Sequence, residues 1–385
     1  MNPLFESLPT SIFEVMSIEA RARRAVNLGQ GFPDFGWPGD VVAKAAEALI
    51  QGSNQYPPMR GLPELREAVA AHYARHQGLV LDAGQIIVTS GATEAIAASL
   101  LALISPGDEV VLFQPLYDAY LPLVRRAGGV PKLVRLTPPD WRITEDALAR
   151  AFSGKTRLVL FNNPHNPTAR LFGADELALI AAAASRTGAL VLADEVWEHL
   201  VFDERRFVSL AALPGMAERV IKIGSAGKIF SLTGWKVGWI AAPPALAGAL
   251  AAAHQFVTFS TPPNLQSAVA YGLGKGDDYY DSMRAGFAGP RDALRAALEA
   301  AGYAALPAEA TYFLNIDLSA SGIHADDSEF CLRAVREAGV AAIPVSAFYA
   351  EDPVKSVVRL CFAKQPATLE AGVAALAKAR ALFAR

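Results

Sequence analysis

Short runs of β-branched and other apolar residues alternate with alanine-rich stretches between about residue 86 and residue 240. We expect buried strands at residues 86–89, 109–113, 157–161, 189–195 and 219–224. Segments between them, such as 94–105 and 174–186, have apolar residues at helical spacing. The alternation predicts an α/β fold whose large domain contains a mostly parallel sheet flanked by helices. Ligands of such sheets bind at the carboxyl ends of the strands.

The pattern changes after about residue 277. A long helical stretch at 278–301 is followed by "TYFLNIDL", another helix, and the apolar runs "VAAIPV" and "VVRLCF". This succession predicts a smaller α+β domain that closes over the first. We expect an N-terminal arm and part of the small domain in residues 1–40, the large domain in residues 41–277, and the small C-terminal domain in residues 278–385.

Charge and hydropathy exclude several classes of partner. A formal net charge of −3, spread over both signs, gives no basic stripe of the kind that binds nucleic acid. No apolar run approaches the roughly 20 residues that a membrane span needs. The acidic residues Glu6, Glu14 and Glu19 among the first thirty argue against a signal or transit peptide. We therefore expect a cytoplasmic protein that binds neither nucleic acid nor membrane.

The cysteines and one histidine pair were considered as metal or redox groups. Cys331 and Cys361 are far apart in apolar surroundings, which favours buried free thiols over a disulfide or a metal pair. His72 and His76 stand four residues apart, a spacing that can bind zinc, but no third ligand follows at a suitable spacing. We interpret this pair as part of an exposed helix face and expect no metal site.

The segment "GSAGKIFSLTGWKVGW" (224–239) contains a lysine, Lys228, whose sequence neighbours are small or apolar and include no acid. Lys228 has no carboxylate three or four residues away, as a solvent-exposed lysine on a helix often has. If it follows a strand and points into a cleft, partial desolvation and the charge of Lys236 favour its neutral, nucleophilic form. The small residues Ser225, Ala226 and Gly227 leave room for a bulky ring, and Lys236 itself needs an anion, such as a phosphate.

Two further segments supply groups that complement this lysine. "TSGATEA" (89–95) follows a strand and opens a helix, where backbone N–H groups and the hydroxyls of Ser90 and Thr93 could bind a phosphate. Asp194 ends an otherwise apolar strand, and a buried carboxylate needs a cationic partner such as a protonated pyridine nitrogen. A Schiff-base lysine, a phosphate site and a pyridinium acid are the parts that pyridoxal 5′-phosphate (PLP) requires.

Two loops after strands complete the hypothesis. Asn166 in "FNNPHNPTA" could donate to the phenolic oxygen of the PLP ring, and Tyr117 in "QPLYDAY" could stack on its face. Seen alone, Asn-Pro pairs are equally typical of ordinary turns, as is the glycine turn of 89–95.

Six passages in order then carry a resemblance to a known family: "VNLGQGFPDF", "NQYPPMRGLPELREAV", "NNPHNPTA", "LADEV", "LPGMAERVIKIGSAGKIFSLTGWKVGW" and "VVRLCF". Over essentially its whole length the chain resembles the class I/II, fold-type I PLP-dependent aminotransferases. Within them it is similar to the kynurenine–oxoglutarate, glutamine and methionine aminotransferase group. The resemblance implies a homodimer with shared active sites and a ping-pong transfer of an amino group from an L-amino acid to a 2-oxo acid.

The resemblance also implies a role for each matching residue. Lys228 would form the Schiff base and carry the substrate proton, Asp194 would hold the pyridinium, and Asn166 would bind the phenolic oxygen. Tyr117 would stack on the ring. Arg359 would bind the substrate α-carboxylate, with Gly31 close by. The phosphate would be bound by Ala92, Thr93, Ser225 and Lys236, joined by Tyr56 from the other subunit.

Two positions depart from the family pattern. Trp197 stands where the family usually has a tyrosine, three residues after the pyridinium acid; its indole N–H can donate a hydrogen bond but cannot accept one. Phe259 is followed by Ser260 where the family has a Phe-His pair, and Phe13 would add an aromatic ring from the N-terminal arm. This apolar and aromatic pocket favours methionine, glutamine or aromatic donors over aspartate.

Three other functions were weighed. A PLP-dependent cysteine-conjugate β-lyase would use the same residues and stays open as an alternative. A PLP-sensing regulator would carry a basic DNA-binding domain ahead of the fold, whereas only a short arm precedes "VNLGQG". A dehydrogenase is disfavoured because no G-x-G-x-x-G follows a predicted strand.

Overall fold

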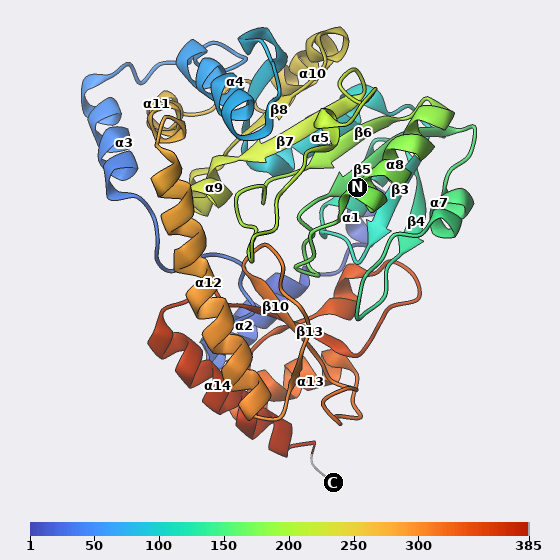
Figure 1. The fold of residues 1–385 in the computed structure, drawn as a ribbon, viewed down its shortest axis with the longest axis vertical. Helices are drawn as coiled ribbons and strands as arrows, with labels where there is room; N and C mark the ends of the chain where they lie inside the picture. The colour runs from blue at the N-terminus through green and yellow to red at the C-terminus, as the bar shows by residue number, and fades with distance from the viewer. Residues whose placement is uncertain (384–385) are drawn as a thin grey trace.

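A seven-stranded sheet forms the centre of the larger part of the molecule in the computed structural model, which describes residues 1–383 (Figure 1). Every neighbouring pair is parallel except the two that involve β8, which is antiparallel to both β2 and β7. The order across the sheet is β2 (Ile86–Ser90), β8 (Val237–Ala241), β7 (Val220–Ser225), β6 (Leu190–Asp194), β5 (Thr156–Asn162), β3 (Glu109–Gln114) and β4 (Val130–Arg135). The predicted mostly parallel sheet is confirmed.

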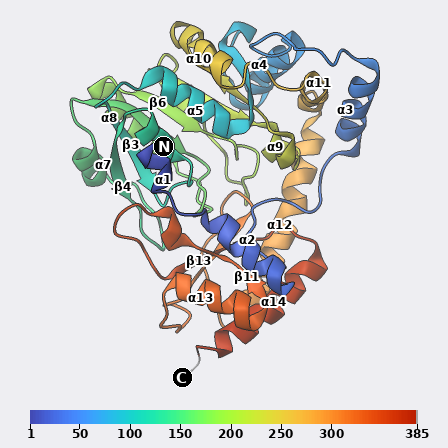
Figure 2. The same cartoon turned by 180° about the vertical axis from the view of Figure 1, so that it is seen from behind.

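Helices lie on both sides of this sheet, as the two opposite views show (Figure 1, Figure 2). Every residue of β3, β7 and β8 is buried, because layers on both faces exclude water from these mostly apolar strands. The helices of this part are α3 (Gly39–Gln51), α4 (Pro63–Gln77), α5 (Gly91–Leu103), α6 (Tyr120–Arg126), α7 (Glu145–Ala151), α8 (Ala174–Thr187), α9 (Ala226–Ile229), α10 (Pro244–Val257) and α11 (Pro263–Leu273).

The five strands predicted for this sheet are confirmed within two residues at either end, but its two other strands were missed. β4 escaped because Pro131 and Lys132 interrupt its apolar run, as is typical of a strand at a sheet edge. β8 lies inside the lysine-containing segment, where glycine and tryptophan obscure the strand pattern. Gly238 is nevertheless required there, since a Cβ atom would lie 2.7 Å from the backbone of Gly91.

A second, antiparallel sheet lies below the first in Figure 1 and is built by the C-terminal part of the chain. Its order is β12 (Ile343–Pro344), β13 (Val357–Cys361), β10 (Phe313–Asp317) and β9 (Ala304–Ala305). Near it, β1 (Val26–Asn27) from the N-terminal segment pairs in parallel with β11 (Val340–Ala341). The expected smaller α+β unit is confirmed, and the boundaries at residues 40 and 277 stay predictions.

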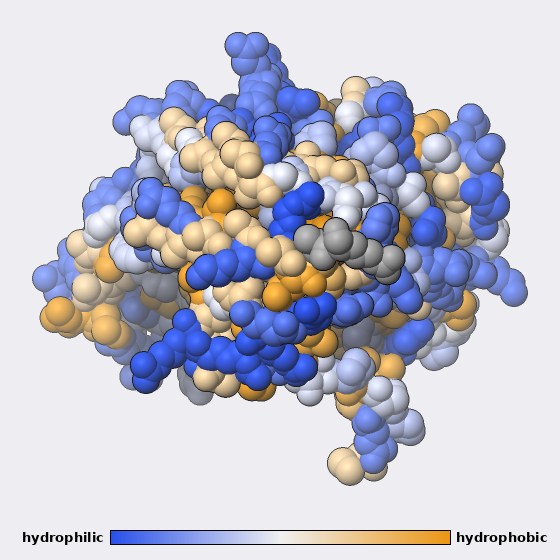
Figure 3. Space-filling model, turned by 90° about the horizontal axis from the view of Figure 1, so that it is seen from below, coloured by the Kyte–Doolittle hydropathy of each residue, from blue (hydrophilic) through white to orange (hydrophobic). Residues whose placement is uncertain are grey.

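One long helix runs from the large sheet toward the small one (Figure 1). It is α12 (Asp277–Ala300), close to the helix expected at 278–301, and it packs on α14 (Pro366–Ala381). The remaining helices are α1 (Pro3–Glu6), α2 (Ile12–Arg23) and α13 (Asp327–Arg333). Seen from below, hydrophilic side chains cover much of this end, with apolar ones between them (Figure 3). Within residues 1–383, no helix is both long and apolar enough to cross a membrane.

The cysteine prediction is confirmed, and part of the histidine prediction is wrong. Cys331 and Cys361 are both buried free thiols. His72, expected on an exposed helix face, is only 2% exposed. The face of α4 that carries it packs inward, against the segment that follows β6, where it meets His199. A pair of polar residues four apart on one helix face does not by itself say which way that face points.

Candidate functional site

A cavity of about 170 Å³ opens at the carboxyl ends of β5, β6 and β7. This is the position at which parallel sheets bind ligands. Nine residues that the sequence analysis singled out line it together: Ala92, Thr93, Tyr117, Asn166, Asp194, Trp197, Ser225, Lys228 and Lys236.

Lys228 projects into this cavity from α9, the short helix that follows β7 directly. Its Nζ donates a hydrogen bond to the Tyr312 hydroxyl at 2.9 Å and lies 4.5 Å from the centre of the Trp197 ring. Burial lowers the pKa of Lys228 to about 8; the charge of Asp194 opposes this shift, and those of Arg359 and Lys236 add to it. About one such amine in ten is therefore uncharged and nucleophilic at pH 7.

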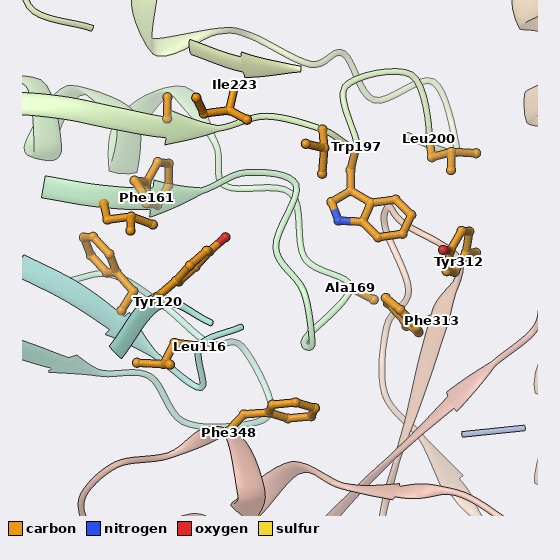
Figure 4. Close-up of a cluster of buried hydrophobic side chains, with 14 of the residues drawn as sticks. Leu116, Tyr120, Phe161, Ala169, Trp197, Leu200, Ile223, Tyr312, Phe313 and Phe348 are labelled. Atoms are coloured by element: carbon orange, nitrogen blue, oxygen red, sulfur yellow. The ribbon is translucent and has the colours of Figure 1, made fainter. Parts of the chain in front are cut away.

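Trp197 and Tyr312 form an aromatic corner around this amine. Their rings meet edge to face with centroids 4.4 Å apart, and Figure 4 shows the indole with Tyr312 and Phe313 beside it. The Tyr312 hydroxyl accepts from Lys228 and donates to the carbonyl oxygen of Gly31 at 2.5 Å. Because this donation fixes the direction of the hydroxyl lone pairs, the amine is held in one position.

Asp194 is the last residue of β6 and is 6% exposed. The Tyr120 hydroxyl donates to its Oδ2, and the backbone N–H of Val196 lies 3.4 Å from its Oδ1. Burial raises the pKa of this carboxyl group despite these hydrogen bonds. Within residues 1–383 no cationic side chain forms an ion pair with it, so the carboxylate can accept a cationic partner from a ligand.

Two asparagines connect this acid to the opposite wall. Asn162, the last residue of β5, donates from Nδ2 to the carbonyl oxygen of Asp194 at 2.8 Å. Its Oδ1 accepts from the backbone N–H of Asn166, also at 2.8 Å. The Asn166 side-chain oxygen in turn accepts from Arg359 Nη1 at 2.8 Å. The loop after β5 is therefore fixed relative to both the acid and the arginine.

The N-terminus of α5 forms another wall of the cavity. The N-cap residue Ser90 makes no side-chain capping bond, and the first-turn N–H groups of Ala92 and Thr93 have no partner within the helix. Gly91 has a φ of +72°, and a Cβ atom there would lie 3.1 Å from Lys236 Nζ. In the described part of the chain Lys236 forms no ion pair. Helix N–H groups beside a free ammonium are suited to a phosphate.

Arg359 lies in the middle of β13 and is 1% exposed. Its Nη2 donates to the carbonyl oxygen of Gly29 at 3.2 Å, while its Nε is buried and has no hydrogen-bond partner among residues 1–383. The ring of Phe313 lies 3.9 Å from the guanidinium carbon, and those of Phe13 and Phe348 lie at 5.1 and 5.2 Å. No carboxylate of residues 1–383 forms an ion pair with this guanidinium.

The surroundings of Arg359 fit a small anion from outside the protein. Burial lowers its pKa to about 10, which is still far above neutral pH, so the group stays charged. A buried cation that lacks a carboxylate partner gains stability when an anion binds.

Tyr56 and Phe259, both expected at the site, do not line this cavity in the single chain. They lie together instead, with their rings edge to face and the centroids 5.6 Å apart. The side chains are 83% and 41% exposed. Gly31 is close to the site through its bond to Tyr312, and a Cβ atom there would lie 2.8 Å from Phe313. Glycine is thus required at position 31 for the N-terminal segment to pass this close.

Three residues of the site were not predicted from the sequence: Asn162, Tyr120 and Tyr312. The first two stood within quoted segments, "FNNPHNPTA" and "QPLYDAY", and their position at or just after a strand end was an available signal. Tyr312 gave no such signal, because "TYFLNIDL" is typical of any half-buried strand. Its role depends on the small sheet meeting the large one, which local sequence does not encode.

Comparisons with known proteins agree with this geometry. A family model described as aminotransferase class I and II matches residues 23–376. The chain is 40% identical to the methionine aminotransferase of Escherichia coli K12, over 96% of this chain and 97% of that protein. It is 37% identical to the kynurenine–oxoglutarate transaminase of Dictyostelium discoideum, over 90% and 88%. The solved structure of N-succinyldiaminopimelate aminotransferase from Mycobacterium tuberculosis superposes with a TM-score of 0.95, at 42% identity, over 98% and 99% of the chains.

Proposed function

We propose, because the chain belongs to the class I and II aminotransferases, that its amino donor is an L-amino acid with a methionine, glutamine or aromatic side chain. Enzymes of this family depend on PLP and exchange an amino group between an amino acid and a 2-oxo acid. We further propose that the reaction is ping-pong, with the two substrates using one site in turn. The names of two relatives, methionine aminotransferase and kynurenine–oxoglutarate transaminase, are consistent with this donor class.

The cavity residues fit PLP. Asp194, which has no ion-pair partner in the described part of the chain, would hold the pyridine nitrogen, and Tyr117 would cover one face of the ring. Asn166 would bind the phenolic oxygen. The phosphate would be bound by four residues at the α5 and α9 ends of the cavity: Ala92, Thr93, Ser225 and Lys236. When bound, PLP would supply an electron sink in conjugation with the substrate α-carbon.

Lys228 would anchor the cofactor covalently and carry the proton that leaves the α-carbon. With a pKa of about 8, roughly one such amine in ten is free to accept a proton at pH 7. The Tyr312 hydroxyl would orient the amine through the 2.9 Å hydrogen bond, and Gly31 would orient the hydroxyl. The Trp197 ring covers one side of Nζ at 4.5 Å, a contact whose cation–π attraction acts on the ammonium form, whereas burial as a whole lowers the pKa.

Arg359 would bind the α-carboxylate of the substrate with two parallel hydrogen bonds. Its contact with Asn166 would place that carboxylate at a fixed distance from the ring of the cofactor. Substrate binding would also satisfy the buried Nε, which lacks a partner among the described residues. This two-point contact would fix which bond at the α-carbon faces Lys228.

The observation that carries the proposed donor class is the composition of the walls. The rings around Arg359 are Phe13, Phe313 and Phe348. Apart from Lys228 and Lys236, no cationic side chain of residues 1–383 lines the cavity. A second carboxylate, as in aspartate, would be desolvated there without a partner, whereas a thioether, an amide or an aromatic ring would not. Ser260 and Phe259 lie outside the cavity of the single chain and would contribute a hydroxyl group and a ring only through a second subunit.

We propose that the second subunit of a homodimer completes the phosphate site. Tyr56 is 83% exposed in the single chain and lies against Phe259, outside the lining of the cavity. Large apolar side chains are also exposed nearby on α3 and α10: Leu49, Ile50, Phe256 and Val257. An exposed apolar area of this kind is typical of a surface covered in an oligomer. The cytoplasmic location stays a prediction.

The test of the donor class is a set of half-reactions with the PLP-loaded enzyme. Single L-amino acids are added and the visible absorbance of the cofactor is followed, which gives kcat/KM for each donor. Methionine, glutamine, phenylalanine or kynurenine should exceed aspartate by at least about 100-fold. Aspartate as the best donor would overturn the proposal. Release of pyruvate and ammonia from a cysteine conjugate, without an acceptor, would favour the β-lyase.

Phe13→Ala provides a matched variant for the same assay. It removes a ring near Arg359 but no group that we place in proton transfer. Its kcat/KM should fall for phenylalanine and methionine and change little for alanine, whose side chain cannot reach the ring. An equal loss for all three donors would mean that Phe13 positions Arg359 and does not select side chains.

A further inference from the structure

Three of the six histidines of the chain gather on the side of β6 and β7 away from the Lys228 cavity. His72 and His76 come from α4 and His199 from the segment after β6. The Nε2 atoms of His72 and His199 lie 2.8 Å apart. The ring of His76 lies 4.6 Å from that of His72 and 5.0 Å from that of His199, centroid to centroid.

A buried carboxylate completes the group. Glu198 is 5% exposed, and one potential ligand atom from each of His72, Glu198 and His199 lies within 4.8 Å of the others. Its Oε2 accepts from Gln77 at 2.5 Å and pairs with Lys222 at 2.7 Å. Its Oε1 is buried and has no hydrogen-bond partner in residues 1–383, and the same holds for Nε2 of His76. Buried atoms with free lone pairs are costly unless an ion or a water binds them.

The charge balance of the cluster favours a cation. Two buried carboxylates, Glu195 and Glu198, face the single buried ammonium of Lys222. The nearby arginines Arg75 and Arg284 pair with Asp277 and Asp281, although their positive charges still help to lower the pKa of His72 and His199. One buried negative charge therefore remains without a partner among the described residues. A divalent ion bound by Glu198 would compensate it.

The tautomers needed for metal binding are available. The Tyr280 hydroxyl lies 3.3 Å from Nδ1 of His72 and can accept from it, which leaves the Nε2 lone pair directed at His199. Such an outer hydrogen bond orients a metal-binding imidazole. Two Nε2 lone pairs facing each other repel unless a proton or a metal ion lies between them. The Tyr280 ring also stacks on His199, with centroids 4.5 Å apart, and so restricts its rotation.

An ion can reach this cluster from outside. His76, Glu198 and His199 line the floor of an open cleft of about 770 Å³, whose rim is formed by residues 201–207 and α12. The cleft shares no lining residue with the Lys228 cavity. Entry to the cluster is therefore separate from the entry of amino-acid substrates.

We propose that His72, His199 and Glu198 bind a divalent transition-metal ion, of which zinc fits best, with His76 available as a further ligand. Two or three imidazoles and one carboxylate suit zinc, whereas magnesium and calcium bind oxygen ligands. The ion would connect α4 to the segment after β6 and would stabilise the fold without entering the amino-transfer reaction. This proposal departs from the expectation, drawn from the sequence, that the chain has no metal site.

The test begins with the PLP-loaded enzyme incubated with zinc chloride and dialysed against metal-free buffer. Mass spectrometry of the metal content should find about one zinc ion per chain. His199→Gln should retain at least about tenfold less, since one of the ligands is lost. His324→Gln, at an exposed histidine far from the cluster in the fold, is the matched control and should retain as much as the native enzyme. Less than about one tenth of an ion per chain in the native enzyme would overturn the proposal.

A second measurement decides the case if His199→Gln folds poorly. X-ray absorption of the zinc-loaded native enzyme should show at least two imidazole ligands with zinc–nitrogen distances of about 2.0–2.1 Å. A spectrum with water ligands alone, or full retention of zinc by a folded His199→Gln enzyme, would mean that the histidines form only a hydrogen-bonded pair. Neither outcome depends on which amino acid the enzyme uses.

Discussion

Lys222 and Lys228 lie six positions apart, the first inside the buried strand β7 and the second in the short helix that follows it. The pKa values of their amines are shifted in opposite directions. Lys222 lies inside β7, is 1% exposed, and pairs with both Glu195 and Glu198. Burial alone would lower its pKa, but these two carboxylates outweigh burial and raise it. Lys228 has no carboxylate in contact, so burial prevails and its pKa falls to about 8.

The same division separates two adjacent acids. Asp194 ends β6 and Glu195 follows it directly, and the two side chains point to opposite sides, as successive side chains of an extended chain do. Asp194 lines the cavity, whereas Glu195 accepts from Ser209 and pairs with Lys222 behind the sheet. Burial is common to all four groups. Lys222 and Glu195 pair with each other and stabilise the fold. Lys228 and Asp194 have no oppositely charged side chain in an ion pair among residues 1–383, so they can react with or bind a ligand.

The largest expected effect is the loss of activity when Lys228, which has no carboxylate in contact, is replaced. Lys228→Ala should lower kcat by at least about 10⁴-fold, because both the covalent anchor and the proton carrier are lost. The free energy of unfolding should change by less than about 1 kcal/mol, since only one hydrogen bond to Tyr312 disappears. Steady-state kinetics and urea unfolding measure the two quantities. Activity within tenfold of native would remove Lys228 from the mechanism.

Lys222→Met should have the opposite pattern. It leaves Glu195 and Glu198 buried without their cation and should destabilise the metal-free protein by about 3–5 kcal/mol. Lys132→Met is the matched control: Lys132 pairs with Glu109 at 3.2 Å but is 41% exposed, and its loss should cost no more than about 1 kcal/mol. Equal unfolding midpoints in urea for the two variants would contradict the comparison.

Arg359→Lys tests whether a buried arginine without a carboxylate partner binds the substrate. A lysine keeps the charge but loses the two parallel hydrogen bonds, so kcat/KM for the best amino donor should fall by about 30- to 100-fold. Most of the loss should appear in KM, because the contact is made in the ground state as well. Arg291→Lys changes another buried arginine, one that pairs with Asp203, and should affect stability instead. A loss confined to kcat would mean that Arg359 does not bind the carboxylate before the reaction.

A titration tests the lowered pKa of Lys228 directly. In apoprotein freed of PLP, the rate of labelling of Lys228 by an amine-reactive reagent should rise with a midpoint near pH 8, against about 10.4 in the unfolded chain. Between these pH values the unfolded chain holds a proton that the folded chain has lost, so this group alone makes stability rise with pH. Peptide mass analysis locates the label. A midpoint near pH 10 would show that the cavity is hydrated more than its walls suggest.

The smallest effect is expected from Tyr312→Phe. Loss of the hydroxyl removes the acceptor that stabilises the ammonium form, so the midpoint of Lys228 labelling should move down by less than about one pH unit. Tyr279→Phe removes a hydroxyl that donates to the Ile229 carbonyl and should leave the midpoint unchanged. An upward shift in Tyr312→Phe would mean that the hydroxyl stabilises the neutral amine.

Sequence alone predicted five of the seven strands of the large sheet and nine of the residues that line the cavity. Strands such as β6 and β7 are continuous apolar runs, and the residues at their carboxyl ends meet because parallel strands place them at one edge. The family resemblance added Arg359, whose partner strand is far away in the chain. The edge strand β4 and the antiparallel β8 were missed, because proline, lysine and glycine weaken their patterns.

The parts that escaped prediction depend on contacts between distant segments. Tyr312 acts on Lys228 only because β10 lies next to the large sheet, and His72 is buried only because α4 packs on the segment that carries His199. Such contacts are properties of the assembled fold. Periodicity reports which face of a helix is apolar, but the polar face of α4 turned inward to meet other polar groups.

The parallel pairing of β1 with β11 has a consequence for biosynthesis. Val26 leaves the ribosome early, yet its partner Val340 is made only near the end of translation. At about 5–20 residues per second, the arm that carries Gly29 and Gly31 waits on the order of tens of seconds for its strand. Newly made chains therefore hold an open, unfinished pocket until the last segment emerges, and a ribosome stalled before residue 340 would carry a folded sheet that cannot bind a carboxylate.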